Sequence, residues 1–406
     1  MRILMLCHRL PYPPVKGEKI RAYHHLRALA REHDLTLLTL ADEPGYAAYL
    51  AGLRALVDDV EVVPISARLG RARALTALAE GRPMSIRYFE TPALARALQT
   101  RLGRVRYDLV FVYSTAMAQY VDGLAGIPVV VDFVDMDSEK WSQYGDRAPF
   151  PLSALYRREA ERLRRYEAGI ARWSRANLFV SPAEAALFKR VAPDAEATVL
   201  PLVVDADVLA PAEAPAPGSP PTVVFVGVMD YPPNVDAVTY FADAIFPAIR
   251  QAEPEARFLV VGQRPCRRVR RLARRPGIQV TGAVPDVRPY LAQAHVSVAP
   301  FRLAQGAQTK VLEAMAMALP VVLTSKACRA LAAEPGRDVV VEDDPGAFAE
   351  AVVRLLRSPE LRARIGRAAR QYVQARHAWT RSAAALNAVL AQARAKSEPL
   401  ALVPAP

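Results

Sequence analysis

Short apolar runs rich in β-branched residues alternate along most of the chain with longer stretches whose apolar residues recur at helical spacing. The short runs have the length of buried strands, and the longer stretches have the length of helices. This alternation is typical of a parallel sheet covered by helices on both faces, so we predict an α/β fold. The predicted strands are Ile3–Cys7, Leu35–Leu40, Val60–Val63, Leu109–Tyr113, Val129–Asp132, Asn177–Val180, Thr198–Leu200, Thr222–Gly227, Arg257–Gly262, Ile278–Thr281, Val296–Pro300, Pro320–Thr324 and Asp338–Val341.

The segment 205–221, DADVLAPAEAPAPGSPP, interrupts the alternation, because it is rich in proline and alanine and has no apolar periodicity. Such a composition is typical of a linker. With 406 residues, the chain is also longer than one hydrophobic core usually serves. We therefore predict an N-terminal domain over 1–204, a C-terminal domain over 222–376, a last helix over 377–396 and a flexible tail over 397–406. Two doubly wound domains would face a cleft, with ligands outside the carboxyl ends of the strands.

The stretch from Gln305 to Val322, QGAQTKVLEAMAMALPVV, predicts a glycine-containing loop and then a helix from Thr309 to Leu319, stopped by Pro320. Unpaired N–H groups and the helix dipole make such a helix start an anion site. Lys310 lies in the first turn, with Glu313 one turn later, on a helix that is otherwise apolar. A nucleotide ribose would supply the hydroxyls that a carboxylate in this position needs. The alternative is an ordinary surface Lys–Glu pair.

A second candidate loop follows the first predicted strand and ends at Gly17, where a helix begins. Glycine at a helix entrance permits close approach of the backbone, so this loop could meet a diphosphate. Lys19 and Arg21 add positive charge. The alternative is a surface turn. No GxGxxG pattern is present, which argues against an NAD-type dehydrogenase.

The formal net charge is +12, mostly from arginine, and two stretches (152–173 and 264–275) predict basic helices. We interpret them as core-packing helices with solvated basic faces. For 152–173 the alternative is peripheral contact with an anionic membrane, and for 264–275 it is that Arg264, just after a predicted strand, faces the cleft. The sequence has no nucleic-acid-binding motif. Its three cysteines are isolated and its histidines lack ligand spacing, so we expect neither disulfides nor zinc. Without an apolar run of membrane-spanning length or a signal peptide, we expect a cytoplasmic protein, with the inner face of the plasma membrane as its peripheral alternative.

Several sequence blocks together resemble a known enzyme family. They are PYPPVKGEKIRAYHHL, DFVDMDSEKW, GVMDYPPNVDAVTYF, VTGAVPDVRPYLAQAHVSVAP and KVLEAMAMALPVV, in this order. The chain resembles glycosyltransferase family 4, whose members are retaining enzymes of the GT-B fold. It is most similar to the sugar transferases of PEP-CTERM/exosortase exopolysaccharide systems. The resemblance implies two Rossmann-like domains, a nucleotide-sugar site in the second domain, and a last helix, entered near His377, that crosses back to the first.

The family's residues can be placed one by one. Glu313 matches the second Glu of the family's Glu–seven residues–Glu motif, which holds the ribose, but Gln305 occupies the position of the first. The Arg and Lys that grip the diphosphate in the family are absent from Gly227–Asn234. We predict that Lys310, Arg264 and the amides of residues 308–311 replace them. Gly17 matches the glycine loop facing the phosphates. The predicted donor-binding residues are Gly17, Asn234, Arg264, Gln305, Gly306, Gln308, Thr309, Lys310, Val311 and Glu313, of which Lys310 and Glu313 are the predicted catalytic residues.

Asp135-Met-Asp137 matches the Asp-x-Asp pattern by which some sugar transferases hold a metal–nucleotide complex. Carboxylates after a strand equally suit hydroxyl recognition, which we favour, so no metal is predicted. Lys19, Arg21, Asp132, Asp135 and Asp137 are the predicted acceptor-side residues.

We therefore predict a metal-independent glycosyltransferase that needs no cofactor and moves a sugar from a nucleotide-diphosphate sugar to a glycan or lipid-linked acceptor, in bacterial exopolysaccharide biosynthesis. Two alternatives are a nucleotide-sugar 2-epimerase of the same architecture and a non-catalytic nucleotide-sugar or glycan-binding protein. The epimerase would release free sugar without an acceptor. The binding protein would neither hydrolyse the donor nor transfer its sugar.

Overall fold

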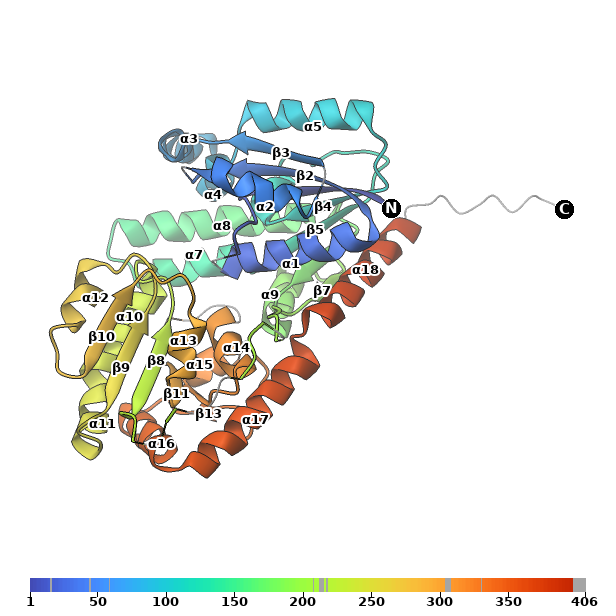
Figure 1. Ribbon diagram of the computed structural model, residues 1–406. Coiled ribbons are helices and arrows are strands. Elements are labelled where there is room, and N and C mark those ends of the chain that lie inside the picture. The colour runs from blue at the N-terminus through green and yellow to red at the C-terminus, as the bar shows by residue number, and fades with distance from the viewer. Residues whose placement is uncertain are drawn as a thin grey trace. The chain divides into compact units, whose positions relative to one another are not determined.

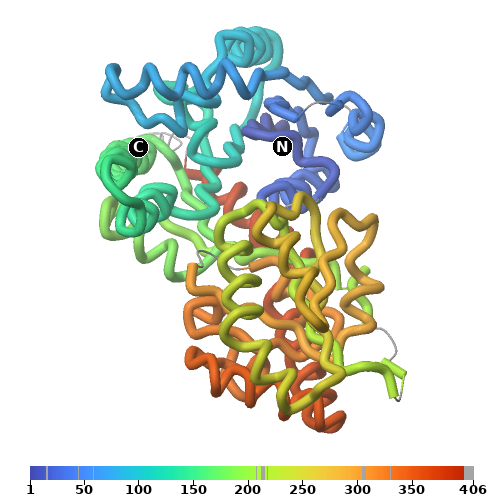
Figure 2. Tube along the Cα trace, turned by 90° about the vertical axis from the view of Figure 1, so that its left-hand side faces the viewer, coloured from blue at the N-terminus to red at the C-terminus, as the bar shows by residue number. Residues whose placement is uncertain are grey.

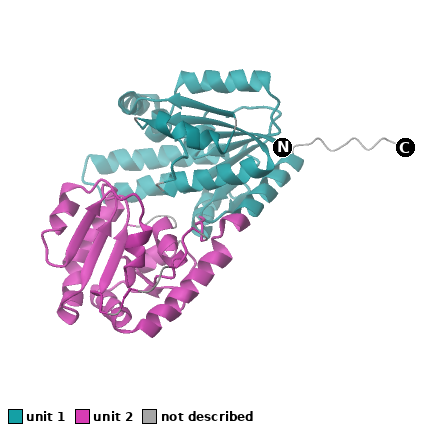
Figure 3. Ribbon diagram, in the orientation of Figure 1, with its two compact units in different colours: residues 1–201, 382–406 teal, residues 202–381 magenta. Residues whose placement is uncertain are grey.

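The computed structural model describes residues 1–396 except 15–16, 44, 58, 207, 212–214, 217, 304–307 and 330. The predicted tail, 397–406, lies outside the described residues. The chain forms two compact units, one made of Met1–Pro201 with Ser382–Pro406 and the other of Leu202–Arg381 (Figure 3). Each unit contains one parallel sheet between helices (Figure 1), so the predicted α/β fold is confirmed.

The sheet of unit 1 has seven strands in the order β3-β2-β1-β4-β5-β6-β7. Its strands are nearly continuous runs of Val, Leu, Ile and Phe, as expected where helices cover both faces. The sequence order reverses between β1 and β4, so this is the point at which their connections diverge to opposite sides of the sheet. The strands are β1 (Arg2–Cys7), β2 (Asp34–Ala41), β3 (Asp59–Pro64), β4 (Leu109–Tyr113), β5 (Val129–Val134), β6 (Ala176–Phe179) and β7 (Ala197–Val199).

Helices of unit 1 connect these strands, and all of those described except the short η1 (Tyr46–Tyr49) have buried residues. Three of them are capped by serine at their N-termini, since Ser66 accepts from Leu69 N–H, Ser114 from Ala116 N–H and Ser181 from Glu184 N–H. The helices are α1 (Gly17–Glu32), η1 (Tyr46–Tyr49), α2 (Leu50–Arg54), α3 (Ala67–Glu80), α4 (Met84–Tyr88), α5 (Pro92–Arg104), α6 (Thr115–Ala118), α7 (Asp137–Gly145), α8 (Leu152–Ile170) and α9 (Pro182–Val191).

The last helix, α18 (Trp379–Ala395), belongs mostly to unit 1 although it is made last. Leu386 and Leu390 are fully buried in the same core as Leu26 of α1. Asn387 Oδ1 lies 3.2 Å from His33 Nε2. The red C-terminal segment thus returns to the unit that holds the N-terminus (Figures 2 and 3).

Unit 2 repeats the architecture with a six-stranded sheet in the order β10-β9-β8-β11-β12-β13. The order reverses between β8 and β11. The strands are β8 (Thr222–Val226), β9 (Arg257–Val261), β10 (Ile278–Gly282), β11 (Val296–Ala299), β12 (Val321–Leu323) and β13 (Val340–Val341). The helices are α10 (Pro232–Tyr240), the π-helical η2 (Phe241–Ile245), α11 (Phe246–Ala252), α12 (Arg267–Leu272), α13 (Arg288–Ala292), α14 (Thr309–Ala316), α15 (Ser325–Cys328), α16 (Pro345–Arg357) and α17 (Pro359–Arg376).

The proline-rich segment that we predicted as a linker is attached to unit 2 where the structure describes it. The guanidinium of Arg370 donates to the carbonyls of Ala206, at 3.1 Å, and Leu209, at 2.9 Å. The ring of His377 donates through Nδ1 to the carbonyl of Leu202, at 2.7 Å. Side chains of α17 and its C-terminal flank therefore fix the start of this segment.

Helix α14 ends at Ala316 instead of the predicted Leu319. Ala318 adopts a left-handed backbone conformation with φ of 57°, and its N–H donates to the Met315 carbonyl. The N–H of Leu319 donates to the Ala314 carbonyl, which completes a Schellman motif. Pro320 follows this turn and does not cause it.

The two predicted basic helices have apolar faces in the interior. In α8, Leu163 and Ile170 are buried, and in α12, Val269 and Leu272 are buried, as predicted. Among the described residues, no helix is long and apolar enough to cross a membrane.

Candidate functional site

Lys310 lies at the place in unit 2 where the strand order reverses. Its ammonium is near two aromatic rings at the carboxyl ends of the strands on either side of that point, 5.5 Å from the ring centre of Phe225 and 4.8 Å from that of Phe301. Open α/β sheets bind their ligands outside the strand ends at such a point. The topology thus puts a cation where this fold places ligands.

Among the described residues, only neutral oxygen atoms accept hydrogen bonds from this ammonium. It donates to Asn234 Oδ1 at 2.8 Å and to Gln308 Oε1 at 3.1 Å. Burial lowers the pKa of Lys310 to about 7, an effect that the nearby Glu313 carboxylate partly opposes. Within the described part of the chain, no carboxylate lies within ion-pairing distance of Lys310, so the predicted alternative of a surface Lys–Glu pair is not the arrangement found. A half-buried cation without a counterion is suited to binding an anion.

Asn234 is held in place by the backbone of the β8–α10 connection. Its Nδ2 donates to the Val228 carbonyl at 2.9 Å, which turns Oδ1 toward Lys310. The side-chain amide fits because residue 227 is glycine: a Cβ there would lie 2.7 Å from Asn234 Nδ2. Gly262 is required next to it, since a Cβ at 262 would lie 1.7 Å from the Gly227 carbonyl oxygen. Close packing of the β8 and β9 ends therefore positions the amide that orients Lys310.

Glu313 lies one turn after Lys310 on α14, whose other faces are apolar and buried. Its carboxylate forms no hydrogen bond or ion pair with any residue that the structure describes. Burial raises the pKa of Glu313, and the charge of Lys310 partly offsets the rise. A buried carboxylate without a hydrogen-bond partner is stabilised by a ligand that donates hydrogen bonds to it.

The N-terminus of α14 holds the remaining described residues that we predicted to bind the donor. Gln308 is the N-cap residue, with extended backbone, and Thr309 is the first helical residue. Val311 is buried, and its N–H donates to the Gln308 carbonyl at 2.9 Å, so that amide is already used within the turn. Gln305 and Gly306, also predicted to bind the donor, lie outside the described residues.

Arg264 follows strand β9 on the same edge of the sheet and has a left-handed backbone, with φ of 54°. Its guanidinium Nε is paired with Asp230 at 3.1 Å, and both side chains are about half exposed. The structure therefore does not bring Arg264 into the hydrogen-bonded group around Lys310.

In unit 1, two of the predicted acceptor-side residues bind each other in the interior. Arg21 donates to both carboxylate oxygens of Asp132, at 2.7 and 3.1 Å, and to the Leu200 carbonyl at 2.7 Å. His25 Nε2 lies 2.8 Å from the same carboxylate. Both members of the Arg21–Asp132 pair are almost fully buried, so neither is accessible to an acceptor. The pair links α1, β5 and the end of β7.

Lys19 and Gly17 have different surroundings. Lys19 is also buried and pairs with Glu43 at 2.7 Å. Gly17 is the exposed first residue of α1, and the two residues before it lie outside the described chain.

Asp135 and Asp137 follow β5 and are partly buried at its carboxyl end. Burial raises the pKa of Asp135 to about 6, and its Oδ1 has no hydrogen-bond partner among the described residues. Asp137 Oδ2 accepts from Thr115 at 3.4 Å, and its Oδ1 lies 3.7 Å from Lys140. Asp135 is therefore the predicted acceptor-side residue that keeps an unused acceptor atom.

Glu184 is a neighbour of this site that we did not predict. Ser181-x-x-Glu184 reads as a capping box in the sequence, and Ser181 does cap α9. The Glu184 carboxylate, however, accepts from Met136 N–H at 2.7 Å, next to Asp135. Burial and the Asp135 charge raise the pKa of Glu184 to about 7. No cluster of three or more potential metal ligands occurs among the described residues.

Comparison with known families bears directly on the Lys310 region. Residues 220–358 match the family model described as Glycosyl transferases group 1. The chain carries a glycosyltransferase domain. The match spans Asn234, Lys310 and Glu313, so the group around Lys310 lies inside this domain. The predicted enzyme class, a glycosyltransferase, is confirmed. A comparison with curated proteins finds no match.

Solved structures similar to this glycosyltransferase extend over both units. Sucrose-phosphate synthase of Thermosynechococcus elongatus has a TM-score of 0.72 at 17% identity, covering 98% of this chain and 100% of that one. HepE of Anabaena, in complex with UDP, has a TM-score of 0.66 at 15% identity, covering 97% and 100%. A variant of S. aureus TarM, in complex with fondaparinux, alpha-GlcNAc-glycerol and UDP, has a TM-score of 0.68 at 9% identity, covering 96% and 100%. At these identities the likeness concerns the fold, and the predicted GT-B fold is confirmed.

Proposed function

We propose that this glycosyltransferase is a retaining, metal-independent enzyme that transfers a sugar from a nucleotide-diphosphate sugar to a glycan or lipid-linked acceptor. The observation that carries the proposal is the half-buried Lys310 ammonium at the reversal point of the unit 2 sheet. It has neutral oxygen partners and lies one helical turn from the Glu313 carboxylate, which has no partner among the residues that the structure describes. One group suits a phosphate and the other a ribose, at the spacing of one turn.

The chemical role of Lys310 follows from where charge develops. When the bond from the sugar to the diphosphate breaks, negative charge accumulates on the departing phosphate. A cation held beside that group stabilises the transition state more than the ground state, which is the condition for catalysis. Asn234 and Gln308 keep the ammonium in place before the ligand arrives, so little reorganisation is required.

Glu313 would hold the nucleotide through the ribose hydroxyls and keep the phosphate next to Lys310. The acceptor's proton would pass to the donor's own phosphate, so no protein carboxylate has to act as the nucleophile. Asp135, with its unused buried oxygen, would accept a hydrogen bond from an acceptor hydroxyl. The role in exopolysaccharide synthesis is supported by the resemblance of the sequence blocks, and a cytoplasmic location fits that role.

The proposal is tested in two steps. A thermal-shift screen with UDP-, GDP- and ADP-sugars identifies the donor, because a ligand that binds only the folded protein raises the melting temperature. The donor is then incubated with glycan and polyprenyl-phosphate acceptors, with and without EDTA, and the anomeric configuration of the product is read by NMR.

Transfer with retained configuration in the presence of EDTA is expected. Inverted configuration would contradict the retaining mechanism. Loss of activity on chelation, restored by Mn²⁺ or Mg²⁺, would show that a metal takes part. Release of free epimerised sugar without an acceptor would identify an epimerase, and binding without turnover of any donor would identify a binding protein.

A further inference from the structure

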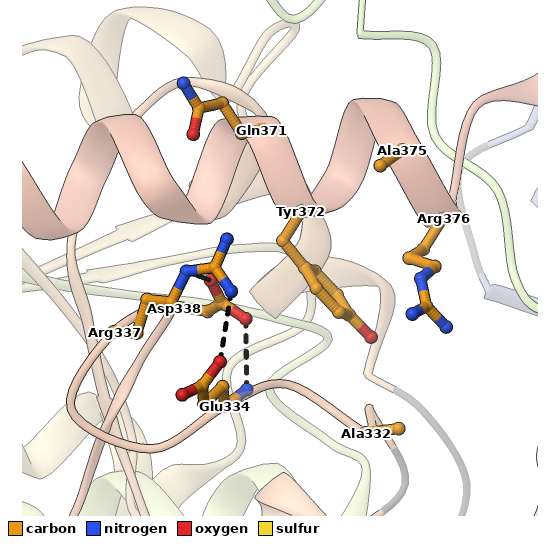
Figure 4. Close-up of a pocket in the computed structure, with 8 residues that line it drawn as sticks. All are labelled: Ala332, Glu334, Arg337, Asp338, Gln371, Tyr372, Ala375 and Arg376. Atoms are coloured by element: carbon orange, nitrogen blue, oxygen red, sulfur yellow. Dashed lines mark hydrogen bonds and ion pairs between the residues drawn. The ribbon is translucent and has the colours of Figure 1, made fainter.

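A cavity of about 350 Å³ in unit 2 lies between α17 and the loop before β13, and none of its lining residues belongs to the group around Lys310. Figure 4 shows Arg337 and Arg376 on either side of the Tyr372 ring. Sites for small molecules typically measure roughly 300–1,000 Å³, so the volume is at the small end of this range. It suits a ligand of about one sugar ring better than a whole nucleotide sugar.

Asp338 supplies an unused acceptor to this cavity. The residue is 4% exposed, and its Oδ2 accepts from Glu334 N–H at 3.0 Å. Its Oδ1 is buried without a hydrogen-bond partner among the described residues, and Arg337 Nε lies 3.7 Å from it. A buried carboxylate oxygen usually has a donor, so the cavity favours a ligand with a donor group.

Arg376 supplies unused donors on the other side of the ring. Among the described residues its guanidinium forms no hydrogen bond or ion pair, whereas Arg337 is paired with Glu334 at 3.0 Å. Tyr372 is held between the two, because its hydroxyl donates to the Leu331 carbonyl and lies 3.2 Å from His377 Nε2. The ring is therefore fixed as one wall of the cavity.

The charges of the lining residues identify the ligand class. Glu334 and Asp338 balance Arg337 and Arg376, so the cavity has no net charge with which to attract a free anion or a cation. Its ligand must both donate to Asp338 and accept from Arg376, which hydroxyl groups do. The tyrosine ring offers an apolar surface to the carbon skeleton. We infer that this cavity is a second sugar-binding site of the glycosyltransferase, which takes one sugar residue through its hydroxyls.

The inference does not rest on the assignment of Lys310 and Glu313, since the two groups share no residue. Saturation-transfer NMR on the full chain tests it, with glucose, galactose, mannose and N-acetylglucosamine as probes at millimolar concentration. At least one sugar should give a signal. Arg376→Ala and Asp338→Asn should each weaken that binding by roughly tenfold or more, the loss typical of a hydrogen bond to a charged group.

Arg367→Ala is the matched control, because Arg367 is an exposed arginine on the same helix, nine residues before Arg376 and so on its opposite face. It should leave the signal unchanged. Lys310→Ala should also leave it unchanged, so that failure of this site and failure of the proposed donor site are told apart. If Asp338→Asn lowers the melting temperature of the protein, Arg376→Ala still tests the site, because Arg376 is exposed.

Three results would overturn the inference. One is that none of the four sugars gives a signal. Another is that the signal survives in Arg376→Ala. The third is that inorganic phosphate binds to the protein but not to Arg376→Ala, while none of the sugars gives a signal. This result would identify an anion site.

Discussion

At the scale of single residues, the most informative feature is the ammonium of Lys310, which is bound by neutral oxygens and lowered in pKa by burial. If Lys310 contacts a phosphate and this contact strengthens as negative charge develops, its removal should lower mainly kcat. We expect Lys310→Ala to lower kcat by roughly a hundredfold or more with little change in melting temperature. Steady-state kinetics beside a thermal melt measure both.

The control for this variant is Lys189→Ala, at an exposed lysine of α9 whose ammonium donates to the nearby Pro193 carbonyl. It should behave as the unmodified enzyme does. Normal turnover in Lys310→Ala would show that the diphosphate is held elsewhere, and Arg264 would be the next residue to test.

The pKa of Lys310 also predicts how donor binding depends on pH. With a pKa of about 7 in the free protein, the side chain loses its proton as the pH rises above that value. Binding a diphosphate then requires proton uptake, so the Kd for nucleoside diphosphate should rise by up to about tenfold per pH unit above neutrality. Calorimetry across the neutral to alkaline range measures it. Lys310→Arg stays protonated and should bind with a flat profile; an equally steep profile in that variant would exclude Lys310 as the titrating group.

Glu313 should contribute to binding more than to stability, because its carboxylate has no partner among the described residues. We expect Glu313→Ala to weaken nucleoside-diphosphate binding by roughly 1–3 kcal/mol while the fold survives, since a hydrogen bond to a charged group is lost. Calorimetry with the diphosphate found in the donor screen gives the value. An unchanged dissociation constant would rule out the ribose contact.

Lys310 and Glu313 could be singled out from the sequence because a cation and a carboxylate stand on an otherwise apolar helix behind a glycine loop. The residues that surround Lys310 and Glu313 in the folded protein could not be predicted in this way. That Phe225 and Phe301 flank the ammonium depends on which strands are neighbours at the reversal point, which no local pattern encodes. We assigned Arg21 to the acceptor side from its charge and Asp132 from its position at the end of a predicted strand. The two residues are 111 positions apart, so no local pattern reveals the buried pair that they form.

At the scale of helices and strands, prediction was accurate wherever a strand is buried on both faces, since a continuous apolar run is then its signature. Helix ends were less certain: α14 stops at Ala316 because of a left-handed alanine, a conformation for which alanine gives no sequence signal. The apparent capping box of α9 likewise failed to reveal that Glu184 binds the backbone after β5. The first failure comes from a local backbone conformation, and the second from a tertiary contact that overrides a local rule.

The Arg21–Asp132 pair is the connection between elements most open to experiment. We expect Asp132→Asn to destabilise the protein by about 3–5 kcal/mol, because the Arg21 guanidinium is left buried without a counterion. Denaturant unfolding measures this. In the unmodified protein Arg21 and His25 outweigh burial and lower the pKa of Asp132 to about 2. This contribution to stability is therefore full above the ordinary carboxyl pKa and is lost as the pH falls toward 2. Asp108→Asn, at a partly exposed aspartate of unit 1, is the control and should cost much less.

At the scale of the whole molecule, unit 1 depends on a helix supplied by the end of the chain. A stop after Arg381 removes Leu386, Leu390 and Ala393 from its core, and two buried leucines alone are worth several kcal/mol. We expect this truncation to lower the melting temperature of unit 1 and to expose apolar surface that binds a hydrophobic dye. A stop after Lys396 keeps every described residue and should melt as the full chain does. Equal melting of both proteins would show that α18 adds nothing to unit 1.

The same discontinuity determines the order in which the protein can fold as it is synthesised. Domains generally begin to fold as they leave the ribosome, N-terminal parts first. Here all of unit 2, residues 202–381, emerges before the part of α18 that contributes Leu386, Leu390 and Ala393 to a core of unit 1. Until then the apolar residues of unit 1 that share a core with α18 lack part of their packing and are more exposed to water and to other nascent chains. The half of the protein that is made first is completed last.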